Sequence, residues 1–311
     1  MTLPPVIFAE SGLETRIYIV DASPWLLDID FIKTYLVKDR LACALIDSGP
    51  SNAASQVAGM VTSLCRSTNK VYIVLTHIHL DHGGGAARLA EYLAQRGFSV
   101  ETLVHPRGER HLRDPTKLWA ASQQVLGERA QEFGEPVPYT MDSLRSTSDG
   151  EQVELGEAVL EIIHTPGHAS HHQSIALELP VGTIMFTGDS AGIYDPLSGG
   201  LVPTTPPPFR LEPFLQSLEK MKKYSPEWIA PTHLGPGPGA LLEKHEEQVR
   251  LWVKIIGDEP GSDMGELIKK ILEADPFAKR LYENLSWSKQ IRGVFMDSIE
   301  GIRLFLQEKK K

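Results

Sequence analysis

The chain has 311 residues, of which 31 are Lys or Arg and 40 are Asp or Glu, so its formal net charge is −9 at pH 7. An acidic chain repels phosphate backbones, which argues against a nucleic-acid partner. No apolar run approaches the roughly 20 residues of a membrane span. The sequence also shows no basic segment followed by an apolar one, which is the pattern of a signal peptide. We therefore expect no membrane partner.

Strands and helices alternate through the first third of the chain. We expect strands at residues 16–20, 31–37, 41–46, 71–75 and 101–105. The segments after 41–46 and 71–75 carry apolar residues at i, i+3, i+4 and i+7, which is the spacing of a helix with one buried face. This alternation is typical of an α/β fold.

The second half of the chain has a different organisation. Residues 107–135 predict a helical insertion that contains Trp119. Strands are expected at 158–164, 173–179, 183–186 and 227–231, with a helix at 212–223. The Gly/Pro run at 235–239 marks a boundary. We therefore expect a catalytic domain at 1–235 and a helical C-terminal region at 236–311, which caps the domain and supports a homodimer.

The two cysteines lie in apolar runs. Cys43 falls in a strand-like segment and Cys65 in a helix-like one. Two cysteines do not make a disulfide framework, so the pattern predicts two buried thiols. Free thiols suit a reducing compartment, and we expect the protein in the cytoplasm.

The first cluster of candidate ligands directly follows a predicted strand. His77 and His79 are two residues apart, so in extended backbone both imidazoles point to the same side and can converge on one metal ion. Asp81 and His82 follow where the chain begins to turn and can face a second metal ion. Four such groups in six residues would be costly to bury without a cation.

Three further candidates also follow predicted strands. They are His168 after Thr165-Pro166-Gly167, Asp189 after Phe186-Thr187-Gly188, and His233 after Pro231-Thr232. Each is a weak signal alone. Ends of strands are where α/β sheets gather their functional residues, so together with the first cluster the three predict a metal centre.

The whole set resembles the metallo-β-lactamase-fold hydrolase superfamily. His77-Ile78-His79-Leu80-Asp81-His82 matches its H-x-H-x-D-H signature, and Asp47-Ser48-Gly49, His168, Asp189 and His233 match its other motifs in the same chain order. The resemblance implies a four-layer αβ/βα sandwich, followed here by the helical C-terminal region. Thr165-Pro166-Gly167-His168 looks most like the glyoxalase II-like branch.

The resemblance also implies a centre of two divalent metal ions. In this assignment His77, His79 and His168 bind the first ion, Asp81, His82 and His233 bind the second, and Asp189 bridges both. Imidazole and carboxylate ligands suit Zn²⁺ first, and also Fe or Mn. The implied reaction is hydrolysis of an ester-like bond (thioester, lactone or ester) in a small-molecule substrate by a metal-bridging hydroxide, with Asp81 as the catalytic group that returns the proton.

Other residues are candidates for supporting roles. By resemblance, Asp47 braces the ligand loop and His172 supports the centre from behind the ligands. Tyr194, Trp119 and Phe209 are candidate substrate contacts, although Trp119 and Phe209 could equally be core residues. His111, His171 and His245 are expected at the surface.

Two other functions remain open at this stage. Persulfide dioxygenases resemble the same motif set and use one iron to activate oxygen, so an oxidoreductase is the main alternative. A non-catalytic metal-binding scaffold is the other, and the full ligand set argues against it. Residues 236–311 lack the basic substrate-binding pattern of true glyoxalase II, so a glutathione thioester is not the specific expectation.

Overall fold

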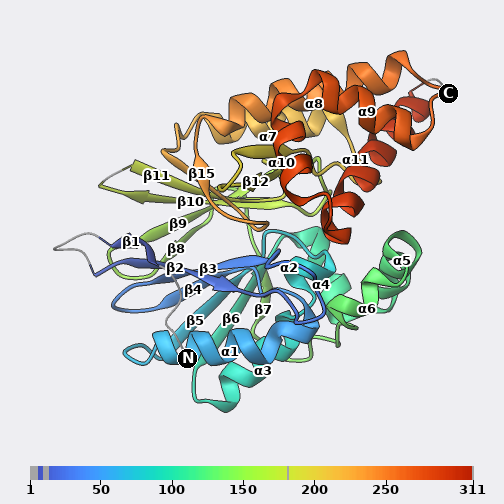
Figure 1. Ribbon diagram of the computed structural model, residues 1–311. Helices are drawn as coiled ribbons and strands as arrows, with labels where there is room; N and C mark the ends of the chain where they lie inside the picture. Colours follow the sequence, from blue (N-terminus) through green and yellow to red (C-terminus); the bar gives the residue numbers. More distant parts are fainter. Residues whose placement is uncertain (1–5, 10–13, 181, 310–311) are drawn as a thin grey trace. The chain divides into compact units, whose positions relative to one another are not determined.

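The structure is a computed structural model that describes residues 6–9, 14–180 and 182–309 (Figure 1). The chain forms two compact units. Unit 1 consists of Met1–His164 and Gln173–Pro180, and unit 2 of Thr165–His172 and Val181–Lys311. The predicted boundary at residue 235, between a catalytic domain and its helical extension, is a different division and stays a prediction.

Unit 1 contains a seven-stranded sheet whose strands lie side by side in chain order. The strands are β1 (Val6–Ala9), β2 (Arg16–Asp21), β3 (Lys33–Lys38), β4 (Cys43–Ile46), β5 (Lys70–Val74), β6 (Ser99–Val104) and β7 (Leu144–Ser146). Strands β1 to β4 pair antiparallel, and β4 to β7 pair parallel. The five strands predicted in this region are confirmed, and β1 and β7 are additional.

Helical crossovers explain why functional residues follow β4 and β5. Parallel neighbours need a crossover connection, which α1 (Ala54–Leu64), after the short 3-10 turn η1 (Ser51–Ala53), provides between β4 and β5. The short helix α2 (Leu80–Gly83) and α3 (Ala86–Gln95) connect β5 to β6. Helices α1 and α3 pack on each other over one face of the sheet (Figure 1). The carboxyl ends of the parallel strands consequently share one edge.

The predicted insertion is helical. It forms α4 (Pro106–Arg113), α5 (Thr116–Leu126) and α6 (Arg129–Phe133). Arg113 ties it to the sheet by donating to the backbone oxygens of Met141 (2.9 Å) and Leu144 (3.0 Å). Helix α5 has no fully buried residue, and Trp119 on it is only half-buried.

Three antiparallel strands complete unit 1. They are β8 (Gln152–Glu154), β9 (Val159–His164) and β10 (Gln173–Leu179). The first residue of β10 is bonded to the end of β5, because Gln173 donates its backbone N–H to Thr76 O and its side-chain Nε2 to Leu75 O, both at 2.8 Å. These two bonds fix the backbone immediately before His77.

Cys43 and Cys65 form a disulfide, so the prediction of two free thiols was wrong. Cys43 begins β4 and Cys65 follows α1, with Cα atoms 6.4 Å apart. Helix α1 runs back along the sheet as a crossover, which returns its last turn to the start of β4. Two cysteines 22 positions apart carry no sequence signal of this return.

Unit 2 is built on a second group of strands. These are β11 (Gly182–Gly188), β14 (Trp228–Pro231) and β15 (Gly237–Pro238). Strands β11 and β14 are parallel, with Gly188 opposite Pro231, and the connection between them includes α7 (Leu211–Lys222). Asp189 and His233 therefore follow neighbouring strands at the same edge.

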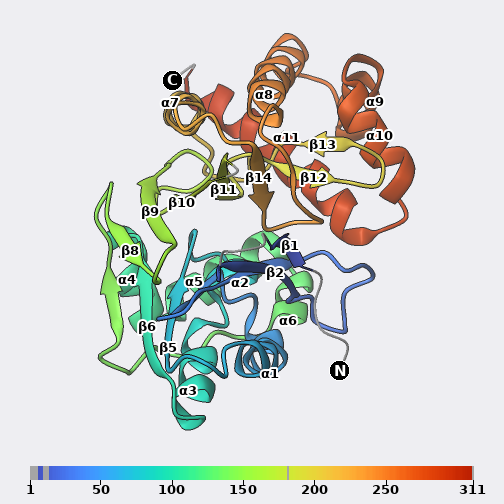
Figure 2. The same cartoon turned by 90° about the vertical axis from the view of Figure 1, so that its left-hand side faces the viewer.

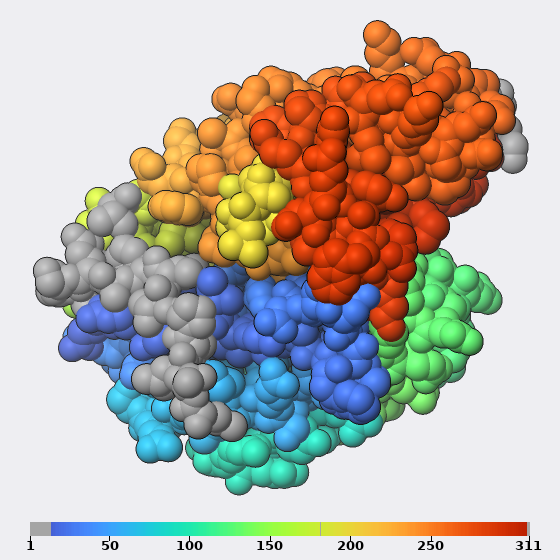
Figure 3. Space-filling model, in the orientation of Figure 1, coloured from blue at the N-terminus to red at the C-terminus, as the bar shows by residue number. Residues whose placement is uncertain are grey.

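The C-terminal region of unit 2 is helical, as predicted. Its helices are α8 (Leu241–Asp258), α9 (Met264–Ala274), α10 (Pro276–Leu285) and α11 (Lys289–Glu308). A hairpin that was not predicted, β12 (Ile193–Asp195) and β13 (Gly200–Val202), packs on α10 (Figure 2). In Figure 3 the yellow residues near position 200 adjoin the red C-terminal helices. Asn284 of α10 donates to Asp195 Oδ2 at 2.8 Å there.

One buried carboxylate joins these helices. Asp275, between α9 and α10, accepts from Trp252 Nε1 and Gln248 Nε2 of α8, both at 2.8 Å. It also caps α10 by accepting from the backbone N–H groups of Phe277 and Ala278. Among the residues described, no helix has the length and apolar character needed to cross a bilayer.

Candidate functional site

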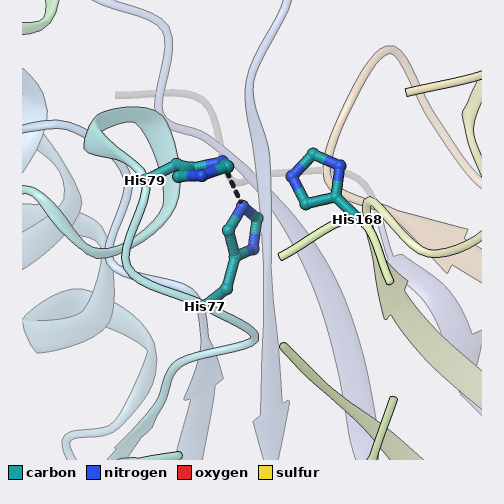
Figure 4. A group of neighbouring side chains, drawn as sticks. All are labelled: His77, His79 and His168. Atoms are coloured by element: carbon teal, nitrogen blue, oxygen red, sulfur yellow. Dashed lines mark hydrogen bonds between the residues drawn. The ribbon is translucent and has the colours of Figure 1, made fainter. Parts of the chain in front are cut away.

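Unit 1 carries the first group of candidate ligands, His77, His79, Asp81 and His82, which we call donor group 1. His77 is fully buried three residues after β5, and His79 is the residue from which α2 begins. Figure 4 shows a ring nitrogen of each imidazole directed at the other, and His77 Nε2 lies 2.9 Å from His79 Nδ1. The first turn of α2 then presents Asp81 and His82, whose Oδ2 and Nε2 atoms are 3.8 Å apart.

Asp47 holds this group from behind. It follows β4 with a left-handed backbone (φ 64°) and is fully buried. Its Oδ2 accepts from His82 Nδ1 at 2.8 Å, and its Oδ1 accepts from the Thr76 backbone N–H at 2.7 Å. The pKa of the neighbouring Tyr35 is raised far above its ordinary value by burial and by the negative charge of Asp47, so Tyr35 stays neutral. This geometry fits the bracing role expected of Asp47.

Thr76 links Asp47 to the other buried histidine of donor group 1. Its hydroxyl lies 2.8 Å from Asp47 Oδ2 and 3.1 Å from His77 Nδ1. A hydroxyl that donates to the carboxylate can accept from the imidazole N–H. His77 and His82 are thus both held at Nδ1, which leaves Nε2 of each ring available to a metal ion.

Unit 2 carries His168, Asp189 and His233, which we call donor group 2. Asp189 lies between the two histidines: its Oδ2 is 3.4 Å from His168 Nε2, and its Oδ1 is 3.3 Å from His233 Nε2. All three side chains are buried. His168 donates from Nδ1 to the backbone oxygen of Thr204 at 2.8 Å, which again presents Nε2.

His172 holds the backbone of Asp189. The Asp189 N–H donates to His172 Nε2 at 3.2 Å, so Nδ1 of that ring carries the proton. Nδ1 lies 2.9 Å from both the Thr165 and the Ser190 hydroxyl oxygens. His172 therefore contacts the backbone at Asp189, a geometry that is compatible with the supporting role predicted for it.

The chemistry of both groups fits divalent cations. In each group imidazole nitrogens lie close to another imidazole nitrogen or to a carboxylate oxygen, and two acceptors at such distances are satisfied by a cation between them. All seven residues have ligand atoms placed closely enough in groups of three to hold a metal ion. His and Asp ligands suit Zn²⁺, Fe or Mn.

The candidate substrate contacts differ in exposure. Phe209 is 1% exposed, with its ring packed on Phe214 and Phe305 at centroid distances of 5.4 and 5.8 Å. This packing fits the core role that the sequence left open. Trp119 and Tyr194 are half-buried, Trp119 on α5 and Tyr194 on β12.

His245 is the clearest correction among the histidines. It was predicted at the surface, but it is fully buried, and burial lowers its pKa to about 4. The reason is the periodicity of α8, where positions 242, 245, 249 and 252 form the buried face. His111 and His171 are half-buried. Thr204, which orients His168, was missed because a backbone oxygen has no sequence signature.

Comparison with known proteins agrees with this geometry. A family model described as the metallo-beta-lactamase superfamily matches residues 27–233. The metallo-beta-lactamase fold-containing protein ST1585 of Sulfurisphaera tokodaii is 28% identical over 247 residues, which cover 78% of this chain and 87% of that protein. The crystal structure of ST1585 aligns with a TM-score of 0.67 at 23% identity, covering 93% of this chain and 98% of that one.

Two enzymes are more distant relatives. The acyl-coenzyme A thioesterase MBLAC2 of Gallus gallus is 28% identical over 194 residues, covering 60% of this chain and 61% of that protein. Hydroxyacylglutathione hydrolase GloC of Haemophilus influenzae is 28% identical over 158 residues, covering 49% and 62%. The chain thus has the metallo-β-lactamase fold, an α/β fold with two mixed sheets and C-terminal helices. It belongs to the metallo-β-lactamase superfamily and is one of its metal-dependent hydrolases.

Proposed function

We propose that this hydrolase cleaves an ester-like bond, and in the first place the thioester bond of a small acyl substrate. The observation that carries the proposal is the placement of Asp189, with one carboxylate oxygen toward His168 and the other toward His233. A carboxylate placed in this way suits a ligand shared by two cations. The relatives named as thioesterase and hydroxyacylglutathione hydrolase favour a thioester among the ester-like bonds.

The proposal assigns the ligands of two divalent cations. His77, His79 and His168 hold one, Asp81, His82 and His233 hold the other, and Asp189 serves both. Zinc is the proposed metal because these ligands are its usual ones. When bound, the cations lower the pKa of a water molecule and withdraw electron density from the substrate carbonyl.

The residues of the chain have distinct tasks in this reaction. Asp47 and Thr76 keep the ligating nitrogens of His82 and His77 turned outward, and Thr204 does the same for His168. The Asp81 side chain is 19% exposed. One of its carboxylate oxygens accepts the proton that the attacking water loses and delivers it to the thiolate that leaves the acyl carbon.

We place the chain in the glyoxalase II-like branch of the superfamily. The support is Thr165-Pro166-Gly167-His168, together with the partial similarity to GloC. The proposed substrate class is small acyl thioesters in general, since residues 236–311 lack the basic pattern expected for glutathione recognition.

A substrate panel tests the proposal. Zinc-loaded protein is assayed with acyl-coenzyme A and acyl-glutathione thioesters, an acyl homoserine lactone and a nitrophenyl ester, beside the His82→Ala variant and a His111→Ala control. We expect metal-dependent thioester hydrolysis that His82→Ala abolishes and His111→Ala retains.

Two results would contradict the proposal. One is hydrolysis unaffected by His82→Ala or by complete metal removal. The other is oxygen consumption with glutathione persulfide by a protein that holds one iron per chain, which would establish the dioxygenase alternative.

The expected partners and localisation remain proposals. A small-molecule substrate, a homodimer and the absence of nucleic-acid and membrane partners all rest on the sequence arguments. Free thiols do not support the proposed cytoplasmic localisation, because Cys43 and Cys65 form a disulfide.

A further inference from the structure

Residues 203–209 form a proline-rich loop, which contains Thr204 and is bonded to the last helix, α11. Thr204 makes two bonds to donor group 2: its backbone oxygen accepts from His168 Nδ1 at 2.8 Å, and its hydroxyl donates to the Asp189 backbone oxygen at 2.5 Å. Thr204 is therefore the common support of two candidate ligands. Its own position depends on what holds the loop.

Ser298 of α11 holds the loop on both sides of Thr204. Its hydroxyl donates to Pro203 O at 2.8 Å and accepts from the Thr205 N–H at 3.3 Å. The Thr205 hydroxyl returns a bond to the Ser298 backbone oxygen at 3.0 Å. Ser298 and Thr205 are both buried, so water does not readily replace these bonds.

Gly301, one turn further along α11, allows the close approach. A Cβ atom there would lie 1.8 Å from the Thr205 backbone oxygen, which is impossible without displacing the loop. The helix backbone thus lies directly against the segment that follows Thr204. Only glycine fits at this position of the helix.

We infer that α11 positions the metal ligands of this chain: Ser298 and Gly301 are positioning residues that act on His168 and Asp189 through Thr204. The inference rests on the proposed metal centre. It gives the C-terminal helices a task in metal binding beyond covering apolar surface. A displaced Thr204 oxygen would release His168 Nδ1, and bonds of this kind to ligating histidines typically change metal affinity by about 10–100-fold.

The test measures metal binding and does not depend on turnover. Metal-free protein is titrated with Zn²⁺ against a chromophoric chelator, and with Co²⁺ to record its visible absorption spectrum. Ser298→Ala is compared with Ser288→Ala, which lies ten residues earlier and removes the N-cap of the same helix together with its bond from the Gln290 N–H. Thr205→Val, which removes one hydroxyl, is the milder second variant if Ser298→Ala fails to fold.

We expect Ser298→Ala or Thr205→Val to weaken Zn²⁺ binding by about tenfold, at the low end of the range for outer partners, and to change the Co²⁺ spectrum. Ser288→Ala should lower the melting temperature while keeping the Zn²⁺ affinity within about twofold. If His168→Ala alters the Co²⁺ spectrum while Ser298→Ala and Thr205→Val leave affinity and spectrum unchanged, the inference is wrong. If Ser288→Ala weakens binding as much as Ser298→Ala, α11 acts only through stability, which also overturns it. If His168→Ala itself retains the wild-type spectrum and stoichiometry, the proposed metal centre fails first.

Discussion

In two buried histidines of the candidate site, an acceptor oxygen at Nδ1 sets which ring nitrogen is available to a metal ion. His82 is held at Nδ1 by the Asp47 carboxylate, and His168 is held at Nδ1 by the Thr204 carbonyl, each at 2.8 Å. In both cases Nε2 is left as the nitrogen that can bind a metal ion. The first holder could be predicted from sequence, because Asp47 stands in a motif. The second could not, because any residue supplies a backbone oxygen.

The contact between Asp47 and His82 predicts a measurable loss of metal affinity. Asp47→Asn removes the negative charge that the His82 N–H faces, and we expect Zn²⁺ affinity to fall by about 10–100-fold. Chelator competition on the metal-free protein measures it.

Asp39→Asn is the matched control for this variant. Asp39 is also a buried aspartate of unit 1, but it bonds to Thr15 and to the backbone of Glu157 and Ala158. It should lower stability without changing Zn²⁺ affinity. Equal Zn²⁺ affinities for Asp47→Asn and the wild type would show that Asp47 does not support metal binding.

His245 predicts a pH dependence of stability. Burial lowers its pKa to about 4 in the folded chain, against roughly 6.5 in the unfolded chain. The unfolded state therefore binds a proton first as pH falls, so the stability that neutral His245 contributes is complete above pH ~6.5 and is lost as pH drops toward 4.

Urea unfolding of metal-free protein at pH 7 and pH 4.5 measures this effect. The ligand histidines are common to the wild type and His245→Gln, so the difference between the two proteins isolates His245. Wild type should lose more unfolding free energy on acidification than the variant, by up to about 1.4 kcal/mol per pH unit. Parallel losses in the two proteins would show that His245 does not titrate in this way.

At the level of elements, hydrophobic periodicity predicted the strands and helices whose burial pattern repeats within a few residues. It missed the features that depend on contacts with distant parts of the chain. The apolar run of β4 and the helical spacing of α1 gave these elements correctly, because both patterns reflect burial within a few residues. The hairpin β12–β13 was missed because each strand has only three residues, and β13 packs on α10, which lies far along the chain. The Cys43–Cys65 bond was missed for the same kind of reason: only the path of α1 brings the two residues together.

The contacts of the C-terminal helices predict that unit 2 cannot hold its structure without them. Phe305 of α11 covers the ring of Phe209, and His245 of α8 lies against Phe214 of α7. Truncation after Gly235 should expose this apolar surface and give an aggregated or much less stable protein. Solubility and circular dichroism of the purified fragment test this prediction. A soluble, folded, active and monomeric fragment would disprove the prediction.

At the level of the whole molecule, the superfamily and its metal-dependent chemistry could be predicted from the sequence, while substrate selectivity could not. Seven His and Asp residues at fixed spacing are enough to predict the chemistry, because metal ligation demands particular atoms. Substrate selection depends on which side chains remain exposed around the reacting bond, and exposure follows from packing. Trp119 and Phe209 were equivalent candidates in the sequence, and the structure separates them.

This difference predicts opposite effects for two aromatic substitutions. Phe209→Ala should cost about 3–5 kcal/mol of stability, as for a buried aromatic residue, and should lower kcat/KM uniformly across substrates. Trp119→Ala should leave stability nearly unchanged and alter the ratio of kcat/KM between thioester and lactone substrates by roughly 10–200-fold. An unchanged ratio for Trp119→Ala would exclude the side chain from substrate selection.

The most direct test of the central claim is the number of metal ions per chain, measured by elemental analysis together with thioester hydrolysis. Wild type and the His111→Ala control should each bind two divalent ions and hydrolyse the thioester at similar rates. His77→Ala and Asp189→Ala should remain folded, lose bound metal and lose nearly all activity. Two ions at full occupancy with near-normal turnover in either variant would contradict the account.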